Sequence, residues 1–169
     1  SYTGTDAATI TGTLNGVLPA DVGLVTLVGT GNFLDVNVGT GITVTAAATL
    51  SGSKAANYSV TQPGGLTGNI TPKGLTVTAN NATRAVGASD PTFTYTITGY
   101  VNGEDEVSAG VSGSALLTTT ATNVSPEGNY PIDCDLNDLA AANYSFTAVD
   151  GTLYVVGSLT WRAGNGLWD

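Results

Sequence analysis

The phrase Ala-Ala-Asn-Tyr-Ser occupies residues 55–59 and recurs at residues 141–145. Each copy is followed by an apolar residue and then by a glycine-bearing turn, Pro63-Gly64-Gly65 after the first and Asp150-Gly151 after the second. A phrase repeated at domain-sized spacing is typical of tandem modules. Alternating residues on both sides of such a turn predict a closing hairpin in each module.

The repeat divides the chain of 169 residues into two modules. We expect a first β module at residues 1–72, a second at residues 73–156, and the start of a following repeat or a tail at residues 157–169. Thr, Val, Gly and Asn are abundant, and these residues suit pleated strands and their turns. The expected fold class is all-β, with two small, elongated β-sandwiches of an immunoglobulin-like or β-grasp-like type.

The strand pattern is clearest in the second module. Phe93, Tyr95 and Ile97 alternate with threonines, so their side chains are expected to share one buried face. Ile132 and Cys134 alternate with acids, which predicts a buried structural thiol. In the first module we expect an edge strand at residues 33–39, with Asp35 and Asn37 facing water.

The charge balance excludes some partners. Thirteen acidic residues against four basic ones give a net charge of −9, a balance that repels phosphate backbones. Nucleic acid is therefore not an expected partner. No apolar run approaches the roughly 18 residues of a membrane span, so direct membrane insertion is not expected either.

Catalytic chemistry has little support in this composition. The chain has no histidine and one cysteine, which rules out a Ser-His-Asp triad and any multi-cysteine zinc site. We therefore expect no enzyme activity, no catalytic residues and no cofactor, calcium being the one possible exception.

Two acidic groups are the candidate calcium ligands. Glu104, Asp105 and Glu106 are adjacent on one expected turn, and Asp133 and Asp135 are close in the sequence. Calcium takes six to eight oxygen ligands, and a turn supplies both carboxylates and carbonyls. Neither group matches the EF-hand loop, and the alternative interpretation is a set of solvated acids.

Four aromatic residues have two possible roles. Tyr58 and Tyr144 each follow the asparagine of the repeated phrase, where a tyrosine can bury its ring and bond its hydroxyl to the backbone. Trp161 and Trp168 flank Gly164-Asn165-Gly166, a hairpin signal. The tryptophans are either a sugar-stacking ligand site or part of the core of a following repeat.

Several phrases resemble known repeat families. Residues 73–156 resemble the MBG repeat (YGX type) of bacterial surface proteins. The matching phrases are Val86-Gly87-Ala88-Ser89-Asp90-Pro91-Thr92-Phe93-Thr94-Tyr95, Ile97-Thr98-Gly99-Tyr100-Val101-Asn102-Gly103-Glu104, Gly128-Asn129-Tyr130-Pro131-Ile132, Asn143-Tyr144-Ser145 and Asp150-Gly151-Thr152-Leu153. The family usually has Tyr-Gly where this chain has Val86-Gly87.

The first module is similar to the companion YDG repeat. Its pattern is carried by Tyr2-Thr3-Gly4-Thr5, Gly39-Thr40-Gly41, Leu50-Ser51-Gly52, Asn57-Tyr58-Ser59-Val60 and Asn69-Ile70-Thr71-Pro72-Lys73. Thr3 stands where the family name has Asp. Residues 159–169 resemble the opening of an autotransporter-associated β-repeat.

These resemblances imply a large secreted or surface-anchored bacterial adhesin. In such proteins the repeats act as non-catalytic structural stalks or spacers, located outside the cell or on its surface. The implied partners are adjacent repeats of the same polypeptide, together with a glycan or protein surface of a host or the environment. The alternative is a glycan- or matrix-binding adhesin module, possibly dependent on calcium, with Trp161 and Trp168 as ligand contacts.

Overall fold

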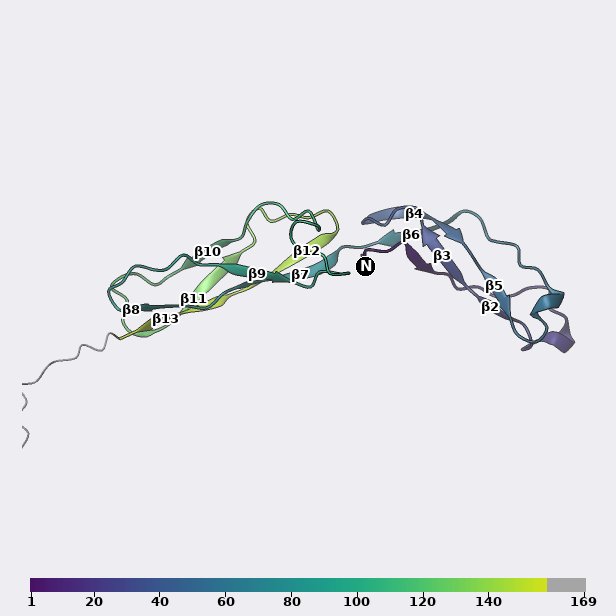
Figure 1. The fold of residues 1–169 in the computed structure, drawn as a ribbon, viewed down its shortest axis with the longest axis horizontal. Helices are drawn as coiled ribbons and strands as arrows, with labels where there is room; N and C mark the ends of the chain where they lie inside the picture. Colours follow the sequence, from purple (N-terminus) through teal and green to yellow (C-terminus); the bar gives the residue numbers. More distant parts are fainter. Residues whose placement is uncertain (158–169) are drawn as a thin grey trace, which may run out of the picture. The chain divides into compact units, whose positions relative to one another are not determined.

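The computed structural model describes residues 1–157, and nearly all of its regular structure is β (Figure 1). Thirteen strands and two short 3-10 turns, η1 (Pro19–Asp21) and η2 (Ala55–Asn57), are present in this described range. The β-rich composition explains this result, because alternating Thr and Val fit a pleated surface with one buried face.

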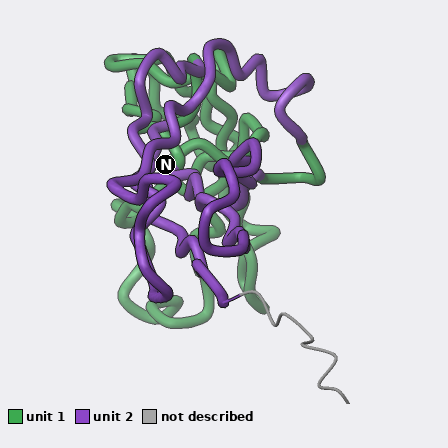
Figure 2. Tube along the Cα trace, turned by 90° about the vertical axis from the view of Figure 1, so that its left-hand side faces the viewer, with its two compact units in different colours: residues 1–73, 101–104, 142–144 green, residues 74–100, 105–141, 145–169 purple. Residues whose placement is uncertain are grey.

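The chain packs as two compact units, coloured separately in Figure 2. Unit 1 comprises Ser1–Lys73 together with two later segments, Val101–Glu104 and Ala142–Tyr144. Unit 2 comprises the remaining described residues. Each unit contains two curled sheets, so the expected all-β fold of two sandwich-like modules is confirmed.

Unit 1 contains a four-stranded antiparallel sheet and a two-stranded one. The larger sheet has the order β1-β3-β4-β6 and consists of β1 (Ala7–Thr9), β3 (Thr30–Phe33), β4 (Gly39–Ala46) and β6 (Leu66–Ile70). The smaller pairs β2 (Thr26–Val28) with β5 (Thr49–Ser51). Because β1 and β6 are the two ends of the larger order, both are edge strands of that sheet.

The expected edge strand at residues 33–39 is wrong. β3 ends at Phe33 and β4 begins at Gly39, and the residues between them form a turn. The Asp35 carboxylate accepts a hydrogen bond from the Asn37 backbone N–H at 2.9 Å. An Asp side chain that bonds the backbone two residues later favours a turn over a strand ladder.

Unit 2 contains a four-stranded and a three-stranded sheet. The order β10-β11-β13-β8 joins β10 (Leu116–Thr119), β11 (Gly128–Asp135), β13 (Gly151–Val156) and β8 (Ala82–Ala85), with β8 parallel to β13. The order β12-β7-β9 joins β12 (Tyr144–Val149), β7 (Lys73–Ala79) and β9 (Tyr95–Thr98).

The core of unit 2 follows the period-two pattern of its strands. Leu75 and Val77 of β7 are at most 1% exposed, and Ile132 and Leu153 from the other sheet are fully buried. The expected shared face is confirmed, because Ile97 is buried and Tyr95 and Phe93 are half-buried, while the threonines between them are exposed. Phe93 lies just before β9. Full burial of one such aliphatic side chain stabilises the folded state by roughly 1.5–3 kcal/mol.

Candidate functional site

A cluster of interacting polar groups in unit 1 centres on the carboxylate of Glu104. The Tyr2 hydroxyl donates to Glu104 Oε1 at 2.9 Å, and the Tyr144 hydroxyl donates to Glu104 Oε2 at 2.5 Å. We call these three residues the tyrosine–carboxylate cluster. Since hydrogen bonds to an ionised acceptor are about twice as strong as neutral ones, this acid binds both tyrosines firmly.

The two tyrosine rings also contact each other. Their centroids lie 5.4 Å apart with planes inclined at 78°, an edge-to-face arrangement. Tyr2 is 7% exposed and Tyr144 5% exposed. Ring pairs of this geometry contribute about 0.5–1.5 kcal/mol beyond their area burial. The expectation that Tyr144 belongs to a core is therefore confirmed.

Burial and the carboxylate both hold the tyrosine hydroxyls in their protonated form. Burial, reinforced by the hydrogen bond to Glu104, raises the pKa of Tyr144 to about 12. The same two causes raise the pKa of Tyr2. Both side chains therefore act as hydrogen-bond donors at neutral pH, and neither is suited to act as a phenolate base or nucleophile.

The asparagine of the second repeated phrase extends the cluster. Asn143 accepts a hydrogen bond from the Val38 N–H at 2.9 Å through Oδ1, and its Nδ2 donates to Asn37 Oδ1 at 2.9 Å. Asn102 Nδ2 donates to the Thr3 carbonyl at 2.8 Å. Every one of these contacts lies inside unit 1, which fixes the two later segments to its N-terminal part.

The tyrosine hydroxyl of each copy of the repeated phrase bonds to a turn, and the two turns are similar. The Val101 N–H donates to the Tyr144 hydroxyl at 3.3 Å, and the Glu104 N–H donates to the Val101 carbonyl at 2.9 Å. The carboxylate that accepts from the tyrosine therefore sits three residues after the amide that donates to it.

Tyr58 repeats this arrangement with other residues. The Leu18 N–H donates to the Tyr58 hydroxyl at 3.2 Å, the hydroxyl donates to Asp21 Oδ2 at 2.8 Å, and the Asp21 N–H donates to the Leu18 carbonyl at 2.9 Å. The hydrogen bond to Asp21 is the main cause that raises the pKa of Tyr58. Tyr58 is only half-buried, so its expected core role is met in part.

The adjacent acids of the expected calcium turn have separate environments. Glu104 is half-buried in unit 1, whereas Asp105 and Glu106 are exposed and belong to unit 2. Asp105 accepts hydrogen bonds from the Ser108 N–H and hydroxyl, both at 2.8 Å, and these bonds lower its pKa. Asp105 therefore caps its own turn.

The second acidic pair lies on a strand. Asp133 and Asp135 are exposed on β11 and alternate with buried Ile132 and Cys134. Within residues 1–157, no group of three or more acidic or cysteine side chains is close enough together to hold a metal ion.

Cys134 is buried, as predicted, and makes no disulfide. Its Sγ lies 3.8 Å from the Val77 carbonyl oxygen. Burial raises the pKa of this thiol, which disfavours the reactive thiolate. Trp161 and Trp168, the expected ligand contacts, lie outside the described residues.

Sequence reasoning missed Arg84, which is 5% exposed and lies on β8. Its Nε donates to Asp90 Oδ1 at 2.5 Å, and its other nitrogens donate to the Thr122 and Ala85 carbonyls. A buried cation is costly unless it is paired, and here every partner is an oxygen. The available signal was an arginine, in the segment that forms β8, followed six residues later by an acid, Asp90.

Glu104 was also missed as a packing residue, because nothing nearby in the sequence indicates its partners. Tyr2 and Glu104 are 102 positions apart, and Tyr144 is 40 positions from Glu104.

No helix in the described part of the chain is long and apolar enough to cross a membrane.

The fold and this cluster define an all-β protein built of tandem modules. Comparison with family models finds a YDG domain at residues 1–65 and an MBG domain (YGX type) at residues 75–154. The chain is therefore a YDG domain followed in tandem by an MBG domain, as its motifs indicated. Both matches indicate a repeat-type, adhesin-like protein. No curated protein and no solved structure matches the chain.

Proposed function

We propose that this chain is a non-catalytic spacer of a large bacterial surface adhesin, and that it holds a distal binding region away from the cell. Its working partners are then the adjacent repeats of the same polypeptide, outside the cell. The tandem of YDG and MBG domains supports this proposal.

The observation that carries the proposal is how unit 1 is assembled. Two segments that lie within the matched MBG domain, Val101–Glu104 and Ala142–Tyr144, belong by packing to unit 1. Tyr2, Asn102 and Asn143 supply hydrogen bonds that hold them there. A spacer benefits from this arrangement, because unit 1 cannot unfold without breaking contacts to chain segments that continue into unit 2.

The proposal is tested by pulling single molecules of residues 1–169 by their two ends. We expect Glu104→Ala to lower the unfolding force of unit 1, because it removes the acceptor of two buried hydroxyls. Glu106→Ala is the matched control, since this neighbouring acid is exposed and lies in unit 2. Equal unfolding forces for the two variants would refute the mechanical role of the cluster.

The alternative, a glycan- or matrix-binding module, is separated by a binding experiment. Folded 1–169 is applied to glycan and matrix-protein arrays with calcium and with chelator. Silence under both conditions agrees with a spacer. Saturable, selective binding would overturn the spacer proposal if Trp161→Ala or Trp168→Ala abolishes that binding.

A further inference from the structure

The two turns that bond the tyrosines of the repeated phrase are themselves a repeat. Gly16-Val17-Leu18-Pro19-Ala20-Asp21 corresponds to Gly99-Tyr100-Val101-Asn102-Gly103-Glu104, and a threonine lies three residues before the glycine in each. Both glycines have a positive φ, 87° in the first copy and 107° in the second. In each, the third residue donates its N–H to the tyrosine hydroxyl and the sixth accepts from it. We call them turn 18–21 and turn 101–104.

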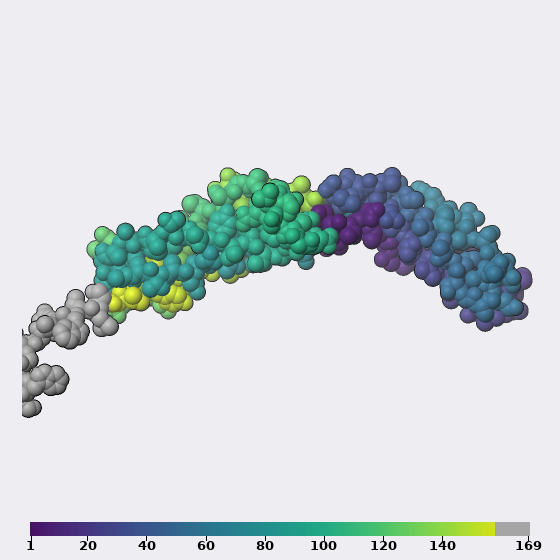
Figure 3. Space-filling view, in the orientation of Figure 1, coloured from purple at the N-terminus to yellow at the C-terminus, as the bar shows by residue number. Residues whose placement is uncertain are grey.

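The two turns differ in how far they are covered. Val101 is half-buried, whereas its counterpart Leu18 is 62% exposed. Tyr144 is 5% exposed, whereas Tyr58 is only half-buried. Figure 3 shows the chain near residues 20 and 55, purple and blue, at the surface of unit 1. Turn 18–21 therefore has the bonding groups of turn 101–104 without its cover.

The cover of turn 101–104 is the segment Tyr2-Thr3-Gly4. The Tyr2 hydroxyl donates to Glu104 Oε1 at 2.9 Å, whereas the Tyr144 hydroxyl binds Oε2. The two rings meet edge to face. In turn 18–21 the Tyr58 hydroxyl binds Asp21 Oδ2, and no hydrogen bond to Asp21 Oδ1 is found within residues 1–157. This oxygen corresponds to the one that Tyr2 binds.

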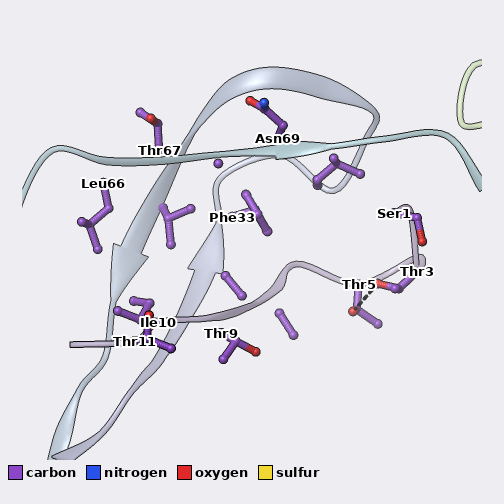
Figure 4. A pocket seen from close by; sticks show the side chains of 15 residues that line it. Ser1, Thr3, Thr5, Thr9, Ile10, Thr11, Phe33, Leu66, Thr67 and Asn69 are labelled. Carbon is purple, nitrogen blue, oxygen red and sulfur yellow. Dashed lines mark hydrogen bonds between the residues drawn. The ribbon is translucent and has the colours of Figure 1, made fainter.

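The glycine of the covering segment lies directly on the turn. A Cβ on Gly4 would lie 3.4 Å from Val101 Cγ2 and would overlap the Asn102 amide nitrogen. Gly4 has a φ of 69°, and the Thr3 and Thr5 hydroxyls are hydrogen-bonded to each other across it at 3.0 Å (Figure 4). A positive φ and a close approach together favour glycine. The covering segment is therefore defined by a tyrosine and by a glycine two residues later.

We propose that turn 18–21 docks a Tyr-x-Gly segment of a neighbouring repeat. The tyrosine hydroxyl of that segment donates to Asp21 Oδ1, its ring packs on Tyr58, and its glycine lies on Leu18. The occupied turn 101–104 favours this occupant, because the chain already makes the same contact there. The inference rests on the spacer proposal and deepens it, because it names the surface through which adjacent repeats join.

Two differences between the turns set the expected strength of the contact. Asn102 donates to the Thr3 carbonyl at 2.8 Å, and Pro19 in its place cannot make this hydrogen bond. Asp21 is also one methylene shorter than Glu104. We therefore expect weak docking that depends on the connection between repeats. A flexible tether reproduces that connection, because it gives a roughly millimolar effective concentration.

A tethered peptide tests the proposal. Ala56→Cys places a thiol on η2 at an exposed position close to Tyr58 in the sequence. The peptide Ser-Tyr-Thr-Gly-Thr, extended by a Gly-Ser spacer and a cysteine, is attached to residues 1–169 through a disulfide. Cys134 does not compete, because burial raises the pKa of its thiol. One control peptide has Phe in place of Tyr, and the other has Ala in place of Gly.

The Leu18 amide signal in the NMR spectrum reports docking. We expect the Tyr-Thr-Gly peptide to shift it, and each control peptide to shift it at most about half as far. Asp21→Asn should reduce the shift about twofold or more, because the acceptor loses its charge. Asp133→Asn, at an exposed acid of unit 2, is the matched control and should leave the shift unchanged. An unmoved Leu18 signal, or equal shifts from all three peptides, would overturn the proposal.

This result is independent of the pulling experiment. If Glu104→Ala lowers the unfolding force and the peptide does not dock, the spacer role stands and the docking site is wrong. If the peptide docks and the Glu104→Ala and Glu106→Ala variants unfold at equal force, the docking site stands and the mechanical role of the tyrosine–carboxylate cluster is wrong.

Discussion

The two copies of Ala-Ala-Asn-Tyr-Ser fold differently although their first five residues are identical. In the first copy, Ala55–Asn57 forms the 3-10 turn η2, and Tyr58 begins an extended stretch that joins no strand. In the second, Tyr144 begins β12. The expectation that each copy begins a closing hairpin is wrong for both copies. Residues 58–60 form no strand, and β12 lies in a different sheet from β13 and does not pair with it.

The hydroxyl contacts of the two tyrosines are nevertheless alike. Each hydroxyl accepts a hydrogen bond from a backbone N–H. It donates one to the carboxylate of the residue three positions after that N–H. Glu104 has a second tyrosine partner, Tyr2, and its cluster is buried, whereas Asp21 and Tyr58 lie at a more exposed position. Both copies of the phrase therefore make the same pattern of hydroxyl hydrogen bonds. The burial of the site and its additional partners decide how much these bonds stabilise the fold.

The largest difference is expected when the two tyrosines are truncated. Tyr144→Ala should lower the free energy of unfolding by about 3 kcal/mol or more, because it empties a buried aromatic site and leaves Glu104 with one partner fewer. Tyr58→Ala should cost about 1 kcal/mol, close to the value of a partly exposed hydrogen bond. Urea unfolding of both variants measures this. Equal losses would show that the two copies are equivalent after all.

The carboxylates come next. Glu104→Ala should cost about 2 kcal/mol, because two buried hydroxyls lose their charged acceptor. Asp21→Ala should cost about half of that, since one half-buried hydroxyl is affected. Differential scanning calorimetry separates the two variants. If Glu104→Ala melts at the wild-type temperature, the tyrosine–carboxylate cluster does not stabilise unit 1.

The asparagines should show a smaller contrast. Asn143→Ala loses two hydrogen bonds, to Val38 and Asn37, and should cost about 1–2 kcal/mol. No side-chain hydrogen bond of Asn57 is found in the described part of the chain, so Asn57→Ala should be close to neutral. Chemical denaturation of the pair gives the comparison. A larger loss for Asn57→Ala would reverse it.

Alkaline pH should reveal the buried tyrosine without any mutation. The pKa of Tyr144 is raised to about 12 in the folded protein, above the value near 10 of an unfolded chain. The folded state therefore holds a proton that the unfolded state has lost, and stability contributed below pH 10 is lost as the pH rises towards 12. Unfolding midpoints measured from pH 8 to 12 should fall, and less steeply in Tyr144→Phe. Parallel curves for the two proteins would contradict this origin.

The local alternation of residues was enough to predict which face of two strands is buried. Phe93, Tyr95 and Ile97 alternate with threonine, and Cys134 alternates with acids, so the buried face of each strand could be read directly. The pattern failed at residues 33–39, because the Asp35 side chain bonds the backbone of Asn37 and stabilises a turn that an alternation count does not register.

The amino-acid sequence by itself determined an all-β chain and the faces that its strands bury, because these depend on residues close together in the sequence. It also indicated two tandem domains, because the phrase at residues 55–59 recurs at residues 141–145. Only the tertiary structure decided that Glu104 binds two tyrosines and that Arg84 is buried against Asp90. Those contacts join residues from separate strands and turns. Their free energy depends on burial and on distant partners, and neither is encoded in any local stretch of sequence.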